Sequence, residues 1–469
     1  MKELKKMKKN EKYKRLMKLL FCVVQISLMV SLYSFLWIGY YNKVILYPFF
    51  RRGNWMMLFI YMLLLIFFMQ LYGGFKVGYL RKGNLIYSQI LSAFFANAIT
   101  YLQIAVQNKA FMSPLPMIGL LVAEALVALL WTTAFQWIYS GMFPPRRMLL
   151  ITGDRLDYHL RDKINARDDK YIIEKTVNYR RGMERLIPEI QKYDAVIIGD
   201  MPSHDRNVIL KYCFQNSIRS YSVPKISDIL LKSSNELNLF DSPLLLSRNM
   251  GLSIEQLFAK RLIDIIGSLI GIVVSLPFFV IIGICIKLTD GGPVLYKQTR
   301  LTKDGKPFEI YKFRTMIQNA EKDGIPRLAA EGDPRILPIG RLLRRTRLDE
   351  LPQIYNILKG DMSFIGPRPE RPQIIREYIE EMPEFAYRTR VKAGLAGYAQ
   401  VYGKYNTSPY DKLKLDLTYI ENYSVWLDLK LMLLTLKVLF WPDSTEGVES
   451  EQVTAFKATY DGRAEKDDD

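Results

Sequence analysis

The sequence contains very little histidine and cysteine. Its 469 residues include two histidines and three cysteines, and no two cysteines lie close together. A zinc site built on these residues needs several of them at short spacing, and a disulfide framework needs a regular set of cysteines. The sequence therefore argues against both. Any metal that the protein uses has to be a hard cation held by carboxylate and phosphate oxygens.

Acidic residues are also in deficit, and no nucleic-acid-binding motif is recognisable. The chain has 65 Lys and Arg against 47 Asp and Glu, which gives a net charge of +18. Such a balance suits nucleic acid, an anionic membrane surface or phosphorylated ligands. Without a nucleic-acid module, and with long apolar runs present, we expect a membrane and phosphorylated ligands as partners and no nucleic acid.

The first third of the chain contains four apolar runs that predict transmembrane helices. Each has about the 20 residues that a helix needs to cross ~30 Å of hydrocarbon. The runs are 19–41, 54–73, 86–106 and 115–139. Basic residues crowd 1–18 and follow the fourth run as Arg146-Arg147, and such flanks favour the cytoplasmic side. An even number of spans allows both on that side, so the rest of the chain is expected in the cytoplasm.

The next hundred residues alternate short β-type runs with helical ones. Three candidate strands occupy 148–152, 171–177 and 195–198. This βαβ order predicts a parallel sheet. The first turn offers the single Gly153 and not G-x-G-x-x-G, so a dinucleotide site is poorly supported. We favour a regulatory or scaffolding role for this domain over a bound nucleotide.

A fifth apolar run, 265–286, is long enough to span a membrane by itself. Pro277, near its centre, removes a helical hydrogen bond and clashes with the carbonyl of Val273. Ser275 is placed to bond a freed backbone group. Charges flank both ends of the run, as expected for a broken helix that dips into one leaflet and returns. The alternative, a kinked spanning helix, would put everything after residue 287 outside the cell.

Residues 341–370 contain the adjacent carboxylates Asp349 and Glu350, preceded by arginines at 341, 344, 345 and 347. An ionised Asp attacks phosphorus once arginines and a divalent cation screen the charge of the target, and the neighbouring Glu is suited to hold that cation. Pro352 and the apolar spacing place the pair at a helix N-terminus, where the dipole keeps carboxylates ionised. The alternative is a solvated helix face with ordinary charge pairs.

The segments before and after the Asp349–Glu350 pair contain further basic residues and apolar positions that are expected to face the core. Residues 308–316 alternate as a strand on which Lys312 and Arg314 share a face. Residues 317–332 predict a mobile polar linker. Helical spacing after the carboxylate pair predicts a core-facing stripe of Leu348, Leu351, Ile354, Tyr355 and Leu358. The glycine-rich segment 391–404 has an ordinary interpretation as a cluster of turns.

Five motifs together resemble a known family: KRLID at 260–264, GGPVLYKQTR at 291–300, FEIYKFRTM at 308–316, LDELPQIYNILKGDMSFIGPRPE at 348–370 and GLAGYAQVYGK at 394–404. They are similar to the bacterial polyprenyl-phosphate sugar-1-phosphate transferases, the monotopic phosphoglycosyl transferases, in their long form. The resemblance implies a membrane α-helical N-terminal bundle (1–144) and a Rossmann-like α/β middle domain (145–245). It also implies an α/β, mainly helical catalytic domain (258–441) with a re-entrant membrane helix (262–286), and then an acidic tail (442–469).

The resemblance also implies an activity and a site. Such enzymes transfer a sugar 1-phosphate from a UDP-sugar to undecaprenyl phosphate at the cytoplasmic face of the bacterial inner membrane, which opens capsule, exopolysaccharide or O-antigen synthesis. Asp349 would be the nucleophile that releases UMP and forms a phosphosugar-aspartyl intermediate. Glu350 would bind Mg²⁺, and Lys312, Arg344 and Arg368 would bind the phosphates and uridine. A homodimer follows by analogy. The alternative is a non-catalytic membrane protein that senses a ligand or binds lipid.

The sequence departs from the family's pattern at two motifs. The helix break is Ser275-Leu276-Pro277, where the family has Ser and Pro adjacent. The glycine-rich motif begins Lys392-Ala393-Gly394 instead of Arg-Pro-Gly, and the family's Trp, Asn and final Arg are replaced by Tyr398, Tyr402 and Lys404. Lys cannot supply the bidentate fork of Arg. We therefore expect the sugar and phosphate contacts of this segment to differ from the family's.

Overall fold

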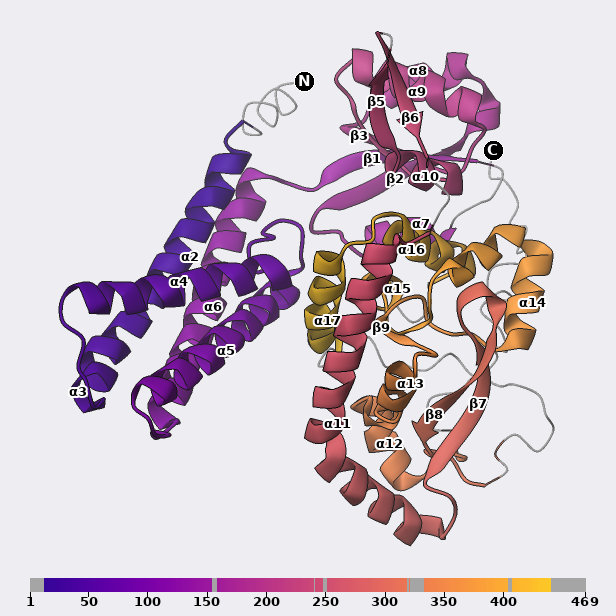
Figure 1. The fold of residues 1–469 in the computed structure, drawn as a ribbon. Coiled ribbons are helices and arrows are strands. Elements are labelled where there is room, and N and C mark those ends of the chain that lie inside the picture. Colours follow the sequence, from indigo (N-terminus) through magenta and orange to yellow (C-terminus); the bar gives the residue numbers. More distant parts are fainter. Residues whose placement is uncertain are drawn as a thin grey trace. The chain divides into compact units, whose positions relative to one another are not determined.

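The computed structural model describes residues 12–153, 158–239, 241–247, 251–318, 320, 333–403 and 407–439 (Figure 1). The chain divides into two compact units, Met1–Pro224 and Lys225–Asp469, and each is considered by itself. Most of the expected linker 317–332, the expected acidic tail 442–469 and Lys404 lie outside the described residues.

Long apolar helices make up the first part of the N-terminal unit. They are α2 (Lys14–Leu36), which continues through a π-helical turn (Trp37–Tyr41) into α3 (Asn42–Val44), then α4 (Arg52–Tyr72), α5 (Lys82–Gln107) and α6 (Leu115–Met142). Four candidate membrane spans, defined by length and composition, coincide with these helices. The helical N-terminal region predicted from the apolar runs is confirmed. Most helix ends lie a few residues outside the predicted runs, whereas α4 ends at Tyr72 because Gly73 adopts the left-handed conformation that terminates a helix.

Three of these helices meet at a buried polar ring. The Tyr61 hydroxyl of α4 hydrogen-bonds to the Glu124 carboxylate of α6 and lies 3.1 Å from Asn97 Oδ1 of α5. Asn97 Nδ2 donates to Glu124 Oε2 at 2.7 Å. All three side chains are buried. Polar groups in such an apolar bundle satisfy one another, and here they fix the relative rotation of three helices.

A parallel four-stranded sheet follows in the order β2-β1-β3-β4. Its strands are β1 (Arg146–Thr152), β2 (Tyr171–Asn178), β3 (Ala195–Ile198) and β4 (Arg219–Ser222), joined by helices α7 (Tyr158–Asn165), α8 (Met183–Ile190) and α9 (Ser203–Gln215). Strand β3 is wholly buried, as expected for a strand covered on both faces. The predicted parallel sheet is confirmed. Strand β4 was not predicted because its sequence, RSYS, is short and polar.

Gly153 has a packing role at the end of β1. A Cβ atom at this position would lie 1.4 Å from the backbone oxygen of Asp200, which follows β3. The loops after two neighbouring strands therefore touch at a point where only glycine fits. The single glycine of the first βα turn is thus explained by close backbone packing.

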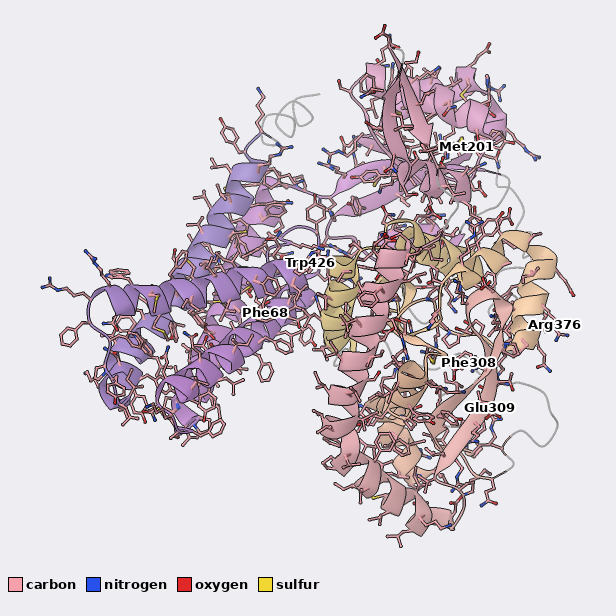
Figure 2. The ribbon with its side chains drawn as sticks, in the orientation of Figure 1. Phe68, Met201, Phe308, Glu309, Arg376 and Trp426 are labelled. Atoms are coloured by element: carbon pink, nitrogen blue, oxygen red, sulfur yellow. The ribbon has the colours of Figure 1, made fainter. Side chains whose placement is uncertain are left out.

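The C-terminal unit begins with a short helix and a hairpin and then contains the longest helix. These elements are α10 (Ile226–Lys232), β5 (Asn235–Leu239), β6 (Ser242–Leu246) and α11 (Ile254–Asp290). An antiparallel hairpin follows, made of β7 (Leu295–Leu301) and β8 (Pro307–Phe313). Figure 2 shows the consecutive residues Phe308 and Glu309 on β8. Phe308 is buried in the core, and Glu309 pairs with Lys297 of β7 at 3.6 Å.

Short elements complete this unit around the hairpin and α11. They are α12 (Pro338–Arg345), the 3₁₀ turn η4 (Leu348–Glu350), α13 (Gln353–Lys359), β9 (Ser363–Ile365), α14 (Pro372–Glu381), η5 (Pro383–Arg390), β10 (Gly394–Ala396), α15 (Tyr398–Tyr402), α16 (Pro409–Glu421) and α17 (Val425–Leu439). Strands β9 and β10 pair in parallel. One core cluster joins Phe308 and Ile310 of β8 to Ile357 of α13 and Met362.

Helix α11 is continuous through Pro277 and bends in its second half (Figure 1). The break expected at this proline is therefore a bend within one helix, a common response to a missing backbone hydrogen bond. The Ser275 hydroxyl donates to the carbonyl of Ile272 at 3.3 Å. It does not bond the carbonyl of Val273, the group that the sequence identifies as freed by proline.

The burial of the first half of α11 is the reverse of that of a helix in a soluble protein. There the buried side is polar and includes Lys260, Asp264 and Ser268, which are spaced by four residues and share one face, whereas Ile282 and Ile286 are buried near the end of the helix. Its exposed side is large and apolar, with Leu262, Ile266, Leu269, Ile270, Val273, Val274, Leu276, Val280, Ile281, Ile284 and Leu288. By length and composition α11 is a fifth candidate membrane span. A helix with its polar face inward and its apolar face outward is suited to contact lipid.

Tyr355 was predicted to face the core together with Leu348, Leu351, Ile354 and Leu358, but in the structure it faces solvent. This side chain is 57% exposed and lies beside Tyr311, with ring centroids 5.8 Å apart, whereas Ile357 is fully buried. The prediction assumed one helix from Leu348 onward. The 3₁₀ turn η4 advances by about 120° per residue instead of 100°, which rotates the positions that follow.

We expect Gly153→Ala to destabilise the sheet, because the added methyl group would overlap the backbone of Asp200. Overpacking of this kind costs about 1–3 kcal/mol or more. The control is Gly141→Ala in the last turn of α6, where nothing lies within 4 Å and Ala favours helix. Thermal unfolding of the full chain in detergent measures both. Equal unfolding temperatures for the two variants would contradict the packing role of Gly153.

Candidate active site

Asp349 and Glu350 lie in the 3₁₀ turn η4, between α12 and α13. Arg347, with φ of 57°, reverses the chain just before the turn, and Pro352 is the N-cap residue of α13. The pair therefore precedes α13 and is not part of its first turn. Both residues are buried, each 8% exposed. In such a turn, neighbouring side chains point in different directions, so each carboxylate has its own surroundings.

Three cationic side chains lie around one carboxylate oxygen of Glu350. Its Oε1 accepts a hydrogen bond from Lys312 Nζ at 2.8 Å and another from Arg368 Nη2 at 2.9 Å, and Arg347 Nη1 lies 3.8 Å away. Lys312 comes from the end of β8 and Arg368 from the segment after β9. Elements far apart in the sequence therefore converge on this carboxylate. We call Glu350, Lys312, Arg347 and Arg368 the Glu350 cluster.

Asp349 has different surroundings from its neighbour. Within the described residues, no side chain forms a hydrogen bond or an ion pair with its carboxylate. Lys312, Arg347 and Arg344 are near enough to act on it electrostatically. A carboxylate that lies near cations but is not bound by them retains its lone pairs for attack on an electrophile.

The two carboxyl groups differ in acidity as well. Burial raises the pKa of Asp349 above its ordinary value, opposed by the charge of Lys312 and assisted by that of Glu350. Burial would also raise the pKa of Glu350, but the charges of Lys312, Arg368 and Arg347 outweigh it and hold that pKa well below its usual range. Glu350 is thus a fixed anion, and Asp349 is the more basic and more nucleophilic of the two.

The other two cations singled out in the sequence, Arg344 and Arg314, lie in different surroundings: Arg344 near Asp349, and Arg314 at the end of α11. Arg344, in the last turn of α12, donates from Nε to the hydroxyl of Thr315 at 2.9 Å and acts on Asp349 through its charge. Arg314 does not join Lys312. It donates to Asp290 at the end of α11, with a 2.6 Å contact to Oδ2, and to the carbonyl of Pro293 at 2.6 Å. Lys312 and Arg314, which were predicted on one face of a strand, therefore have separate partners.

Arg347 is the residue of the Glu350 cluster that sequence reasoning left without a role. Its place before the carboxylate pair was visible, but its left-handed backbone conformation was not. That conformation turns the chain sharply before η4. Its guanidinium is thereby brought within reach of Glu350.

The glycine-rich segment 391–404 packs against the backbone next to Arg368, where Gly394 N donates to the carbonyl of Pro367. Strand β10 pairs with β9, and the glycines at 366, 394 and 397 bring backbones into contact. A Cβ on Gly394 would lie 2.1 Å from Gly366 N. These glycines therefore have a packing role. The rings of Tyr398 and Tyr402 in α15 pack against one another at an interplanar angle of 44°, with centroids 4.5 Å apart.

The side chains near Glu350 can be compared with the ligands that the expected Mg²⁺ would need. In the described part of the chain, no three His, Cys, Asp or Glu side chains gather around one point. Mg²⁺ does not require such a group, because it commonly binds one or two carboxylates together with substrate phosphates and water. The hydrogen bonds that Glu350 accepts from Lys312 and Arg368 are both made by its Oε1. A site made of Glu350 and phosphate oxygens is thus compatible with the residues present.

Comparison with known proteins supports the resemblance. The model of the family described as "Bacterial sugar transferase" matches residues 255–442. A UDP-N-acetylgalactosamine-undecaprenyl-phosphate N-acetylgalactosaminephosphotransferase of Aeromonas hydrophila is 36% identical over 263 residues, 53% of this chain and 59% of the relative. A UDP-glucose:undecaprenyl-phosphate glucose-1-phosphate transferase of Klebsiella pneumoniae is 37% identical over 263 residues, 55% of each chain. The chain thus spans less than two thirds of these two relatives.

A shorter relative is covered more completely. A UDP-glucose:undecaprenyl-phosphate glucose-1-phosphate transferase of Caulobacter vibrioides is 37% identical over 191 residues, which is 39% of this chain and 71% of the relative. The residues that the family model matches include Asp349 and the Glu350 cluster. The chain belongs to the bacterial sugar transferase family.

Proposed function

We propose that this protein transfers a sugar 1-phosphate from a UDP-sugar to undecaprenyl phosphate and so initiates synthesis of a capsule, exopolysaccharide or O-antigen. The observation that carries the proposal is the division between Asp349, whose carboxylate is unbound among the described residues, and Glu350, which is neutralised by three cations. The names of the relatives support these two substrates. A site rich in Lys and Arg suits a diphosphate.

The reaction follows from these assignments in two displacements. Asp349 attacks the β-phosphorus of the UDP-sugar, the bond from that phosphorus to the bridging oxygen breaks, and UMP leaves with the oxygen. The product is a phosphosugar joined to the Asp349 carboxylate. A phosphate oxygen of undecaprenyl phosphate then attacks the same phosphorus, the bond to Asp349 breaks, and undecaprenyl diphosphate sugar forms. The carboxylate is regenerated.

The surrounding cations stabilise the charge that builds up on the phosphoryl oxygens. Lys312, Arg344 and Arg368 are the side chains assigned to the phosphates and uridine, and Arg347 joins them on structural grounds. Glu350 would hold Mg²⁺ together with phosphate oxygens. When bound, the metal would screen the diphosphate and assist departure of UMP.

The membrane placement follows from α11. In its first half a polar side packs on the catalytic unit, and along its length large apolar side chains face outward. We assign it as a re-entrant helix in the bacterial inner membrane, with its bend at the Ser275–Pro277 region within one leaflet and the catalytic unit on the cytoplasmic side. This keeps the nucleotide substrate and the lipid acceptor on the same side. A homodimer is part of the same assignment, by analogy with the family.

We expect Asp349→Asn to abolish UMP release, because an amide is a poor nucleophile toward phosphorus. The loss should be on the order of a thousandfold or more. The control is Asp304→Asn in the exposed turn before β8, where φ is 57° and Asn is well tolerated. UMP release from a panel of UDP-sugars, with undecaprenyl phosphate and Mg²⁺, measures both and also identifies the sugar. Normal turnover by Asp349→Asn, or a phosphosugar adduct mapped to another residue, would exclude this nucleophile.

For Glu350→Gln we expect weaker metal binding, since an amide oxygen replaces an anionic ligand. The dissociation constant for Mn²⁺, measured by electron paramagnetic resonance in the presence of UDP, should rise at least about tenfold. Glu309→Gln on the exposed side of β8 provides the control. Unchanged Mn²⁺ affinity with lost turnover would instead show that Glu350 acts only through Lys312 and Arg368.

Cysteine labelling tests the topology. In a background without Cys22, Cys213 and Cys285, a cysteine at Lys306 should resist a membrane-impermeant maleimide in intact cells and react after permeabilisation. A cysteine at the exposed Phe111, between α5 and α6, should react in intact cells. Labelling of the Lys306→Cys variant from outside would make α11 a spanning helix and overturn the re-entrant assignment.

A further inference from the structure

The segment 365–370, which carries Arg368, is held by its backbone carbonyls. Five of its six carbonyls accept hydrogen bonds from outside the segment: Ile365 from Lys260 Nζ at 2.8 Å, Pro367 from Gly394 N at 2.9 Å, Arg368 from Arg388 Nη2 at 3.2 Å, Pro369 from Arg300 Nη1 at 3.1 Å and Glu370 from Leu301 N at 3.2 Å. Three of these donors are cationic side chains. They come from α11, η5 and β7.

Each of the three cations also has a carboxylate partner. Lys260 pairs with Asp428 of α17 at 2.7 Å, and Arg388 pairs with Asp416 of α16 at 2.6 Å. Both pairs are buried. Arg300 lies 3.8 Å from Glu370, within the segment itself. The same arrangement of carboxylate, cation and backbone carbonyl therefore occurs three times around one short stretch of chain.

The segment depends on these contacts because it has little structure of its own. Pro367 and Pro369 flank Arg368, and proline has no backbone N–H to donate. Within the described residues, Arg368 is the member of this segment whose side chain reaches Glu350. Its guanidinium is partly exposed and so available to a ligand. A shift of about 1 Å in such a group can cost a hundredfold in rate.

We propose that Lys260, Arg300 and Arg388 are positioning residues that fix the Arg368 segment from three sides, so that the Arg368 guanidinium is presented both to Glu350 and to the diphosphate of the substrate. The inference deepens the proposed function and rests on it. Lys260 gives the arrangement a second consequence. It belongs to the first turns of α11, so the helix assigned to the membrane is bonded directly to the segment that bears a phosphate-binding arginine.

The alternative is that these pairs only stabilise the core. A purely structural pair would change the fraction of folded protein and leave the folded enzyme's substrate affinity unchanged. A positioning pair changes affinity through Arg368 and has no further effect once Arg368 has been removed. Double-mutant cycles separate these two cases.

The first test uses Arg388→Met, Arg368→Ala and the double variant in the full chain. We expect Arg388→Met to raise KM for the UDP-sugar and to lower kcat/KM by about tenfold to a hundredfold. The double variant should be no worse than Arg368→Ala alone, and Arg388→Lys should recover part of the loss. UDP binding, measured by calorimetry without turnover, should weaken in parallel. This second readout remains informative even if the enzyme proves to catalyse a different reaction with a UDP-linked substrate.

Arg388→Met leaves the buried Asp416 without its ion-pair partner, which is why Arg388→Lys accompanies it; for Lys260 both charges of the pair are removed. The double substitution Lys260→Met with Asp428→Leu removes both charges and avoids the penalty of an isolated ion. We expect this variant to fold and to bind UDP at least about tenfold more weakly, because the Ile365 carbonyl loses its cationic donor. An unchanged affinity for UDP would overturn the positioning role of Lys260.

Arg314 supplies a matched control. It is buried, pairs with Asp290 and donates to the carbonyl of Pro293, so it has the same kind of partners at a different place in the same unit. Arg314→Met should lower the unfolding temperature and leave UDP affinity unchanged. Two results would overturn the proposal: equal losses of UDP affinity in Arg314→Met and Arg388→Met, or losses from Arg388→Met and Arg368→Ala that multiply in the double variant.

Discussion

The rest of the catalytic unit depends on the ion pairs of the Glu350 cluster. It joins the turn η4, which carries Glu350 and directly follows Arg347, to β8 through Lys312 and to the segment after β9 through Arg368. A buried carboxylate with so many cations is a net positive centre. Such a centre is stable only if each cation is held by its own element, and it leaves a surplus of positive charge for a diphosphate. The adjacent Asp349 then meets an electrophile whose negative charge has been compensated.

Sequence reasoning predicted the local features well and the long-range partners poorly. Apolar runs and β-type runs identified the helices of the N-terminal unit and three strands of the sheet, because these patterns are set by nearest neighbours. The Asp349–Glu350 pair was visible because both residues and their arginines lie close together in the chain. Tyr355 was wrongly predicted to face the core. The 3₁₀ turn before α13 rotates the following side chains about the helix axis, and the residue types in this segment do not indicate that turn.

Charged residues at the start of α11 show why the partners were missed. Lys260 and Asp264 looked like charges that flank a membrane run. In the structure both are buried, and they bond to Ile365, Ser363 and Phe364, about a hundred residues later. Arg314 likewise has partners in the turn after α11 and not beside Lys312. Such pairings depend on the tertiary fold, which a single sequence reveals only where a family resemblance supplies it.

The polar ring of Tyr61, Asn97 and Glu124 has a consequence for biogenesis. A carboxyl group that enters a bilayer alone is unfavourable by about 3 kcal/mol at the centre of a helix. Glu124 belongs to α6, the last of the four helices, and its partners belong to α4 and α5, which precede it in the chain. During synthesis from the N-terminus the partners are therefore already present when Glu124 arrives. The order of the helices along the chain allows the helix that carries the buried carboxyl group to insert beside its partners and not into bare lipid.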